Sequence, residues 1–255
     1  MKVDVVSLEG KKVKSIDLPV QFSEDYEPNL IKRAMLAVFS HNRQPYGAMS
    51  RAGKNSSGKL SRRRRDYKGS YGKGMSRVPR KTMWRRGTQF GWVGTFISGT
   101  VGGRRAHPPK VTKNWNLKIN EKERKKAIRS AMAGVANQGK LMIVEDKITT
   151  LKKVKEVKDT LVKLGFETDA VKRKRAGRGK SRGREIRYKK NALVVVDKNC
   201  DLLTSLANLP GYDIVNVRNL NANLLSLNFD LPRKCIFTES AINVIDKEKL
   251  FGVKK

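Results

Sequence analysis

The sequence predicts an α/β fold with a mostly parallel sheet and helices on both faces of it. It also predicts a long basic extension that is inserted into this domain. Continuously apolar runs at residues 141–144 and 192–196 are typical of parallel strands that are covered on both sides. Helical patterns with short connections alternate with such runs, as they do in α/β domains. The third observation is the distribution of charge, because +28 of the formal net charge of +34 lies in residues 43–113 and 172–190.

The neutral part of the chain begins with an expected hairpin, in which residues 2–8 and 13–18 flank a turn. Pro28 then opens a helix whose apolar residues recur at spacings of three and four. After the extension, Asn120 followed by Glu123 predicts the capped start of a second helix.

The rest of the chain alternates between strands and helices. Gly165 is expected to stop a helix that starts at residue 150. Further elements are expected as a short helix at 202–209, a strand at 213–217, a helical stretch at 221–227, a strand at 235–237 and a helix capped by Thr238. We therefore expect a globular domain of residues 1–42 and 114–255, with residues 43–113 inserted as an extended loop.

Composition narrows the function classes. A sequence pI of about 10.5 points first to nucleic acid and second to an anionic membrane surface. Cys200 and Cys235, without CxxC spacing, argue against a disulfide framework or a zinc ribbon. The start of the chain has no apolar signal region, and the longest uncharged run, residues 87–103, is too short and too glycine-rich to span a bilayer. We expect an intracellular protein that binds a polyanion and no membrane.

Catalytic motifs are weak. Residues 134–141 have the glycine and lysine spacing of a phosphate-binding loop, but Leu141 stands where a Ser or Thr must reach magnesium, and a glycine turn at a helix end explains them better. His41 ends the first expected helix, and His107 has no Cys or His at ligand spacing. For His107 we favour contact with a base or phosphate over a purely structural turn. We expect no enzyme, no cofactor and no metal.

Residues 43–113, here called the basic extension, contain 19 basic residues, 12 glycines and a single acidic residue, Asp66. No stretch of it sustains a helical or strand period for long, which predicts a segment that orders on a partner. Four consecutive arginines, residues 62–65, suit bidentate phosphate contacts. Its aromatic residues suit base stacking, although Trp84, Phe90, Trp92 and Phe96 could instead form a small apolar cluster.

Residues 172–190, here called the second basic segment, carry 11 basic residues against Glu185 alone. A solvated charged loop is the alternative, but this excess favours contact with RNA. Residues 177–183 are glycine-rich without forming a dinucleotide fingerprint, and a flexible RNA-contacting loop explains them better.

Several motifs resemble the ribosomal protein L-four family of the large subunit, in its archaeal and eukaryotic branch. In the basic extension these are residues 72–80 (GKGMSRVPR) and 101–110 (VGGRRAHPPK), of which the second is the strongest. The remaining matches are residues 120–133, 177–187, 192–197, 206–210 and 237–241.

The resemblance implies a structural constituent of the large ribosomal subunit in the cytoplasm, which binds large-subunit rRNA and supports early subunit assembly. It implies that the basic extension penetrates the rRNA and that its tip lines the polypeptide exit tunnel. The implied partners are large-subunit rRNA, neighbouring ribosomal proteins and the nascent polypeptide. The alternatives are an RNA-modifying α/β enzyme that holds its RNA substrate with the extension, and a nonspecific DNA binder.

Two sets of residues follow as candidates. The RNA-binding candidates are Arg51, Lys54, Lys59, Arg62, Arg63, Arg64, Arg65, Lys68, Lys73, Arg77, Arg80, Lys81, Arg85, Arg86, Arg104, Arg105, His107, Lys110, Lys113, Lys172, Arg173, Lys174, Arg175, Arg178, Lys180, Arg182, Arg184 and Arg187. The candidates for the tunnel tip are Arg77, Arg80, Met83, Trp84, Arg85 and Arg86.

Overall fold

Two units make up the chain in the computed structural model: Met1–Asn42 together with Asn116–Lys255, and Arg43–Trp115. The first unit is made of two segments of the chain, and the second unit is a single segment. The structure describes residues 1–66, 69–87, 89–168, 171–227 and 232–252.

The first unit is built on a sheet whose six strands are β1 (Lys2–Val6), β2 (Lys12–Asp17), β5 (Leu141–Val144), β8 (Leu193–Val196), β9 (Asp213–Asn216) and β10 (Cys235–Thr238). Their order in space is β2-β1-β5-β10-β8-β9. The β1–β2 pair is antiparallel, and every other pair is parallel. The predicted mixed α/β class with a mainly parallel sheet is confirmed.

The central strands are apolar throughout because both of their faces are buried. In β10, Cys235 and Phe237 pack into one core, and Ile236 between them packs into the other. Phe22 meets the Phe237 ring edge-on, with the ring centroids 5.9 Å apart. Burial also raises the pKa of the Cys235 thiol to about 12, so this cysteine remains a protonated core side chain.

Helices cover both faces of the sheet. The first core lies under α1 (Pro28–His41), α2 (Glu121–Asn137), α6 (Ala222–Leu225) and α7 (Glu239–Lys247). The second lies under α3 (Val154–Lys163), α5 (Asp201–Ala207) and the 3-10 turn η2 (Asp146–Thr150). Two further 3-10 turns are η1 (Val20–Phe22) and η3 (Val217–Asn219). No helix among the described residues is long and apolar enough to cross a membrane.

Helix ends show where local sequence signals were sufficient. Thr238 caps α7 as predicted, because its hydroxyl accepts the backbone N–H of Ala241. Asn120 does stand at the N-cap of α2, but its side chain makes no capping hydrogen bond, and the Glu123 carboxylate pairs instead with Arg33 at 3.3 Å. The helix predicted from residue 150 begins later, at Val154, because residues 146–150 form η2.

Candidate nucleic-acid interface

The second unit contains a β-hairpin of β3 (Arg80–Arg86) and β4 (Gln89–Gly94). No stretch of the basic extension sustains a strand period in the sequence, yet residues 80–86 and 89–94 form paired strands. The register shifts between Thr82 and Trp84, so Thr82 pairs with Trp92 whereas Trp84 pairs with Gly91. This bulge breaks the two-residue period that would have revealed the strand in the sequence.

Aromatic side chains of the basic extension differ in how far they are packed. Phe90 and Trp92 pack against each other with ring centroids 4.4 Å apart. Trp84 lies over Gly91 yet stays 56% exposed, and Tyr71 is also exposed. Some rings are therefore packed within the unit, and others remain open to a stacking partner.

Cations lie over several of these rings. The Lys73 Nζ is 5.5 Å from the centroid of the Trp92 ring, and the Arg77 guanidinium is 5.5 Å from that of Tyr71. Cation–π contacts of this kind keep long basic side chains close to aromatic faces. The basic extension thus presents positive charge and rings as combined surfaces.

The candidates for the tunnel tip do not all lie together. Met83, Trp84, Arg85 and Arg86 lie at or near the turn end of the β3–β4 hairpin, whereas Arg80 begins β3 and pairs with Gly94 at its other end. At about 3.3 Å per residue, the length of β3 separates Arg80 from Arg86 by roughly 20 Å. Arg80 is also held locally, because its guanidinium donates to the carbonyl of Val78 and the hydroxyl of Ser76.

Most RNA-binding candidates of the basic extension are exposed, and Arg80, Lys81 and Arg104 are half-buried. Residues 62–65 present four exposed guanidinium groups in succession. Lys68 lies outside the described residues. The remaining exposed candidates are Arg51, Lys54, Lys59, Lys73, Arg77, Arg85, Arg86, Arg105, His107, Lys110 and Lys113.

A cluster at the two ends of the second unit was not among the features predicted from the sequence. The rings of Tyr46 and Trp115 lie 5.0 Å apart, and the Arg43 guanidinium lies 4.7 Å from the Trp115 centroid. The Lys113 Nζ lies over the same indole at 5.5 Å. The sequence signal that could have predicted this cluster is an aromatic residue close to a basic residue at each end of the inserted segment, Arg43 with Tyr46 and Lys113 with Trp115. The cluster joins the two ends of the inserted segment, near Tyr46 and Trp115.

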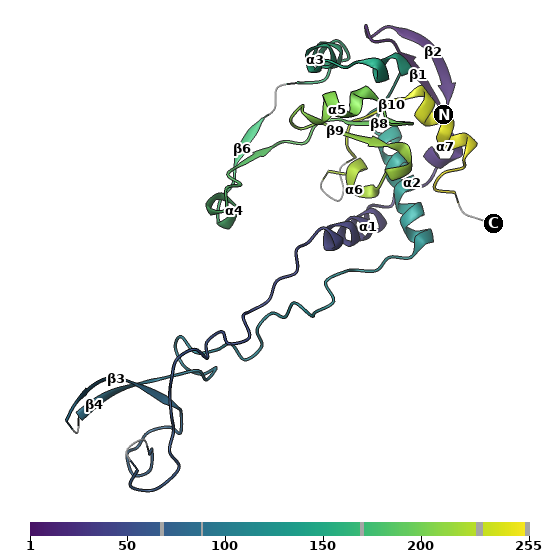
Figure 1. Cartoon of the computed structure of the whole chain (residues 1–255). Helices are drawn as coiled ribbons and strands as arrows, with labels where there is room; N and C mark the ends of the chain where they lie inside the picture. Colours follow the sequence, from purple (N-terminus) through teal and green to yellow (C-terminus); the bar gives the residue numbers. More distant parts are fainter. Residues whose placement is uncertain (67–68, 88, 169–170, 228–231, 253–255) are drawn as a thin grey trace. The chain divides into compact units, whose positions relative to one another are not determined.

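The second basic segment forms a hairpin rather than the expected irregular loop. Its strands are β6 (Lys172–Lys174) and β7 (Ile186–Tyr188), and one helical turn, α4 (Arg178–Ser181), lies between them (Figure 1). Every residue of β6 is basic, so no apolar period in the sequence marks this strand. All nine RNA-binding candidates of this segment are exposed: Lys172, Arg173, Lys174, Arg175, Arg178, Lys180, Arg182, Arg184 and Arg187.

Register gives this hairpin two chemically different faces. Lys172 pairs with Tyr188 and Lys174 pairs with Ile186, so these four side chains share one face. Arg173 and Arg187 pair on the other face. Tyr188 and Ile186 are 38% and 52% exposed, and neither was among the candidates.

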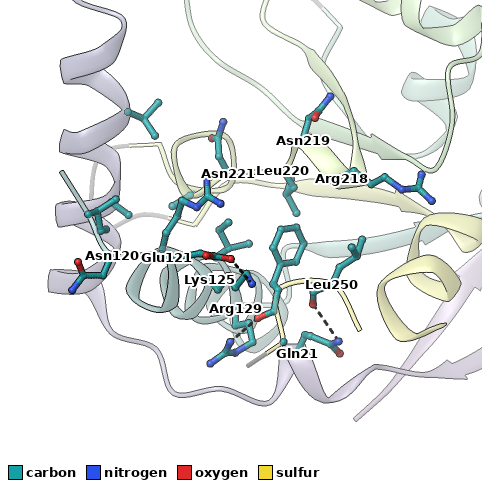
Figure 2. Close-up of a pocket in the computed structure, with 18 of the residues that line it drawn as sticks. Gln21, Asn120, Glu121, Lys125, Arg129, Arg218, Asn219, Leu220, Asn221 and Leu250 are labelled. Atoms are coloured by element: carbon teal, nitrogen blue, oxygen red, sulfur yellow. Dashed lines mark hydrogen bonds and ion pairs between the residues drawn. The ribbon is translucent and has the colours of Figure 1, made fainter. Parts of the chain in front are cut away.

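The first unit also contains a groove of about 1690 Å³ between α1, α2, η3 and the chain after α7 (Figure 2). Its charged residues are largely engaged: Arg129 pairs with Glu24 at 2.7 Å and donates to the carbonyl of Phe251 at 2.6 Å. Lys125 pairs with Glu121 at 2.8 Å. The Arg129–Phe251 contact holds residue 251 against α2.

The apparent phosphate-binding loop is a helix end, as predicted. Gly134 lies within α2, where the Tyr26 ring packs so closely that a β-carbon would come within 2.5 Å of it. Gly139 follows the helix with φ +63° and ends it, and β5 begins at Leu141. The order is helix, turn and strand, which is the reverse of a phosphate-binding loop.

Comparison with known proteins agrees with the motifs. The model of the "Ribosomal protein L4/L1 family" matches residues 16–248. The large ribosomal subunit protein uL4 of Nanoarchaeum equitans is 42% identical, over 98% of this chain and 100% of that protein. The uL4 proteins of Archaeoglobus fulgidus and Methanocaldococcus jannaschii are each 37% identical, over 96% and 95% of this chain and 98% and 97% of theirs. With a matching family model over most of its length and full-length relatives, this chain belongs to the ribosomal protein L4/L1 family.

Proposed function

We propose that the chain is a structural, non-catalytic constituent of the large ribosomal subunit in the cytoplasm, where it binds large-subunit rRNA and supports early assembly of the subunit. Membership of the family supports this role. The single observation that carries the RNA-binding part is the segregation of charge, because two exposed segments hold +28 of the net +34. The alternative of an RNA-modifying enzyme gains no support, since the one nucleotide-loop candidate is a helix end.

Binding would come mainly from the exposed lysines and arginines. Neutralising phosphates releases counterions from the RNA, which supplies affinity without reading sequence. Site selection would then depend on the shape of the rRNA and on unpaired bases that stack on exposed rings. Trp84, Tyr71 and Tyr188 are the exposed rings that fit this role.

The basic extension is the part that would enter the rRNA, as a loop inserted between residues 42 and 114 of the globular domain. The turn end of the β3–β4 hairpin, with exposed Met83, Trp84, Arg85 and Arg86, is the best candidate for a tip that contributes to the wall of the exit tunnel. Arg77 and Arg80 lie toward the base of that hairpin and would contact rRNA behind the tip. The nascent polypeptide and neighbouring ribosomal proteins would be its further partners.

Sedimentation tests the proposal directly. A cell lysate is fractionated on a sucrose gradient in about 0.5 M salt, and the chain is located by immunoblotting. Comigration with large subunits at this salt is expected, because an embedded extension resists the screening that removes loosely bound basic proteins. A free pool or one bound to chromatin would refute the proposal, and an RNA-modifying enzyme would be found off mature subunits.

A further inference from the structure

One short segment, Gly211–Tyr212–Asp213, contacts the chain on both sides of the second basic segment, at Glu167 before it and at residues 190–191, where it ends. In the sequence, Glu167 precedes this hairpin and Asn191 follows it. The Tyr212 hydroxyl donates to the carbonyl of Glu167 at 2.7 Å. The side-chain amide of Asn191 donates to that same carbonyl and, at 3.1 Å, to the Tyr212 oxygen.

A buried arginine, Arg233, holds the chain just after the second basic segment. Arg233 is only 2% exposed, and its guanidinium donates to the carbonyls of Asn191, Ala192 and Gly211. It also donates to the Asp213 carboxylate at 2.6 Å. A buried guanidinium needs its donors satisfied, and its partners here are residues 191–192 after the hairpin, Gly211 and Asp213, the first residue of β9.

Gly211 allows this close approach. Its φ is +92°, and a β-carbon there would come within 2.7 Å of the carbonyl of Lys189. The Asn191 N–H donates to the Gly211 carbonyl at 2.7 Å, and the Lys189 N–H donates to that of Val171 at 3.0 Å. Both limbs of the hairpin are therefore fixed where they meet the sheet.

We propose that Tyr212, Asn191 and Arg233 form a clasp whose function is to hold the second basic segment in one orientation for RNA, with Tyr212 as a positioning residue that touches no RNA itself. This inference rests on the proposed function. The clasp ties together the root of a hairpin that has no apolar core of its own. A hairpin fixed at its root loses less conformational freedom on binding than one that swivels, and its cations meet phosphates at less cost.

Burial keeps the Tyr212 hydroxyl protonated, so that it remains a hydrogen-bond donor. Tyr212 is 5% exposed, and burial raises its pKa to about 12. The phenol thus keeps its proton at every pH at which a ribosome works, so the clasp does not open by titration of this group.

The test compares Tyr212→Phe in the full chain with Thr160→Val, which removes a half-buried hydroxyl that donates to the Val157 carbonyl within α3. Amide hydrogen exchange of the free protein should become about tenfold faster at Lys189 and Asn191 in Tyr212→Phe. Exchange at Val194 and Ile236, in β8 and β10, should stay as in the wild type. Uniform acceleration across the sheet would mean that Tyr212 stabilises the fold and does not specifically position the hairpin.

Binding is then measured against deproteinised large-subunit rRNA at fixed salt. Tyr212→Phe should bind about three- to tenfold more weakly, and Thr160→Val should bind as the wild type does. The decisive arm repeats Tyr212→Phe in a chain in which all nine exposed basic candidates of the segment are glutamine: Lys172, Arg173, Lys174, Arg175, Arg178, Lys180, Arg182, Arg184 and Arg187. There the tyrosine change should have no further effect, because the groups that it positions are gone.

The outcomes separate the two claims. An equal loss of affinity in both backgrounds, or no loss in either, would overturn the clasp as a positioning device while leaving RNA binding intact. Failure of the wild-type chain to bind rRNA would instead refute the proposed function, and the positioning role would fall with it.

Discussion

The indole ring of Trp84 on β3 lies over the α-carbon of Gly91 on β4, so closely that a β-carbon at position 91 would come within 2.3 Å of the indole nitrogen. We predict that Gly91→Ala displaces Trp84 and shifts its indole N–H resonance in a nitrogen-15 spectrum of the full chain. Gly99→Ala is the matched control, because nothing lies within 4 Å of a β-carbon there. An unshifted Trp84 resonance in Gly91→Ala would contradict the cross-strand contact.

Charge at residues 62–65 should carry part of the affinity for rRNA. Changing these four arginines to glutamine should weaken binding and lower the slope of log affinity against log salt, by up to about 0.9 for each phosphate that is no longer neutralised if the site is duplex-like. Filter binding over a series of salt concentrations measures both quantities. The control removes four exposed lysines of the first unit, Lys155, Lys163, Lys198 and Lys247. An equal effect of the control would show that net charge matters and position does not.

Limited proteolysis should separate the two units. In the isolated protein, trypsin should cut first within residues 43–113, because this segment is rich in exposed Lys and Arg and its strands lack a covering layer. The sheet of the first unit should resist, and added rRNA should protect the extension. Mass spectrometry of the early fragments gives the sites. Protection of the extension without RNA would show that it is ordered on its own.

Stability should depend on Asp213 in acid. Burial raises the pKa of this carboxyl, but hydrogen bonds from Lys190 and Arg233 outweigh burial and hold the pKa below its ordinary value of 3.8. Its folded pKa is depressed, so its stabilising effect is complete above pH 3.8 and is lost as the pH falls through the lower folded value. Asp213→Asn should cost roughly 1–3 kcal/mol at pH 7, because Arg233 loses its buried counterion.

Urea unfolding between pH 2 and pH 7 measures that dependence. The difference between the wild type and Asp213→Asn should be constant from pH 7 down to about pH 5 and should shrink below pH 3.8. Asp201→Asn serves as the control, since Asp201 pairs with Lys152 at the surface at 3.4 Å and such pairs contribute little. A difference that grows toward low pH would contradict the assigned direction of the shift.

The sequence was sufficient where local chemistry decides the structure. The run Leu193–Val196 is fully buried and forms β8, and Thr238 caps α7 through its own hydroxyl. Such elements carry their signal in a few adjacent residues, either as apolar runs or as cap residues. The family motifs predicted membership of the L-four family, and the comparisons confirmed it.

Features that depend on contacts between distant residues were not predictable. Trp115 packs against Tyr46, which lies at the other end of the extension. Arg233 contacts Asn191 and Asp213, which lie 42 and 20 positions earlier in the sequence. The strands of the β3–β4 and β6–β7 hairpins were not predicted, for a different reason. In β3 a bulge interrupts the period, and in β6 every side chain is basic, so only backbone pairing defines the strand.

A contact between residues near the two ends of the chain has a consequence for folding during synthesis. The Gln21 side chain donates to the carbonyl of Ile245, which lies 224 positions later in the chain. At a translation rate of roughly 5–20 residues per second, those partners emerge about 11–45 s apart. The basic extension is made within that interval, so it leaves the ribosome attached to a domain that cannot yet complete its core. Nascent chains of this protein therefore expose their most cationic segment before they have a folded unit to anchor it.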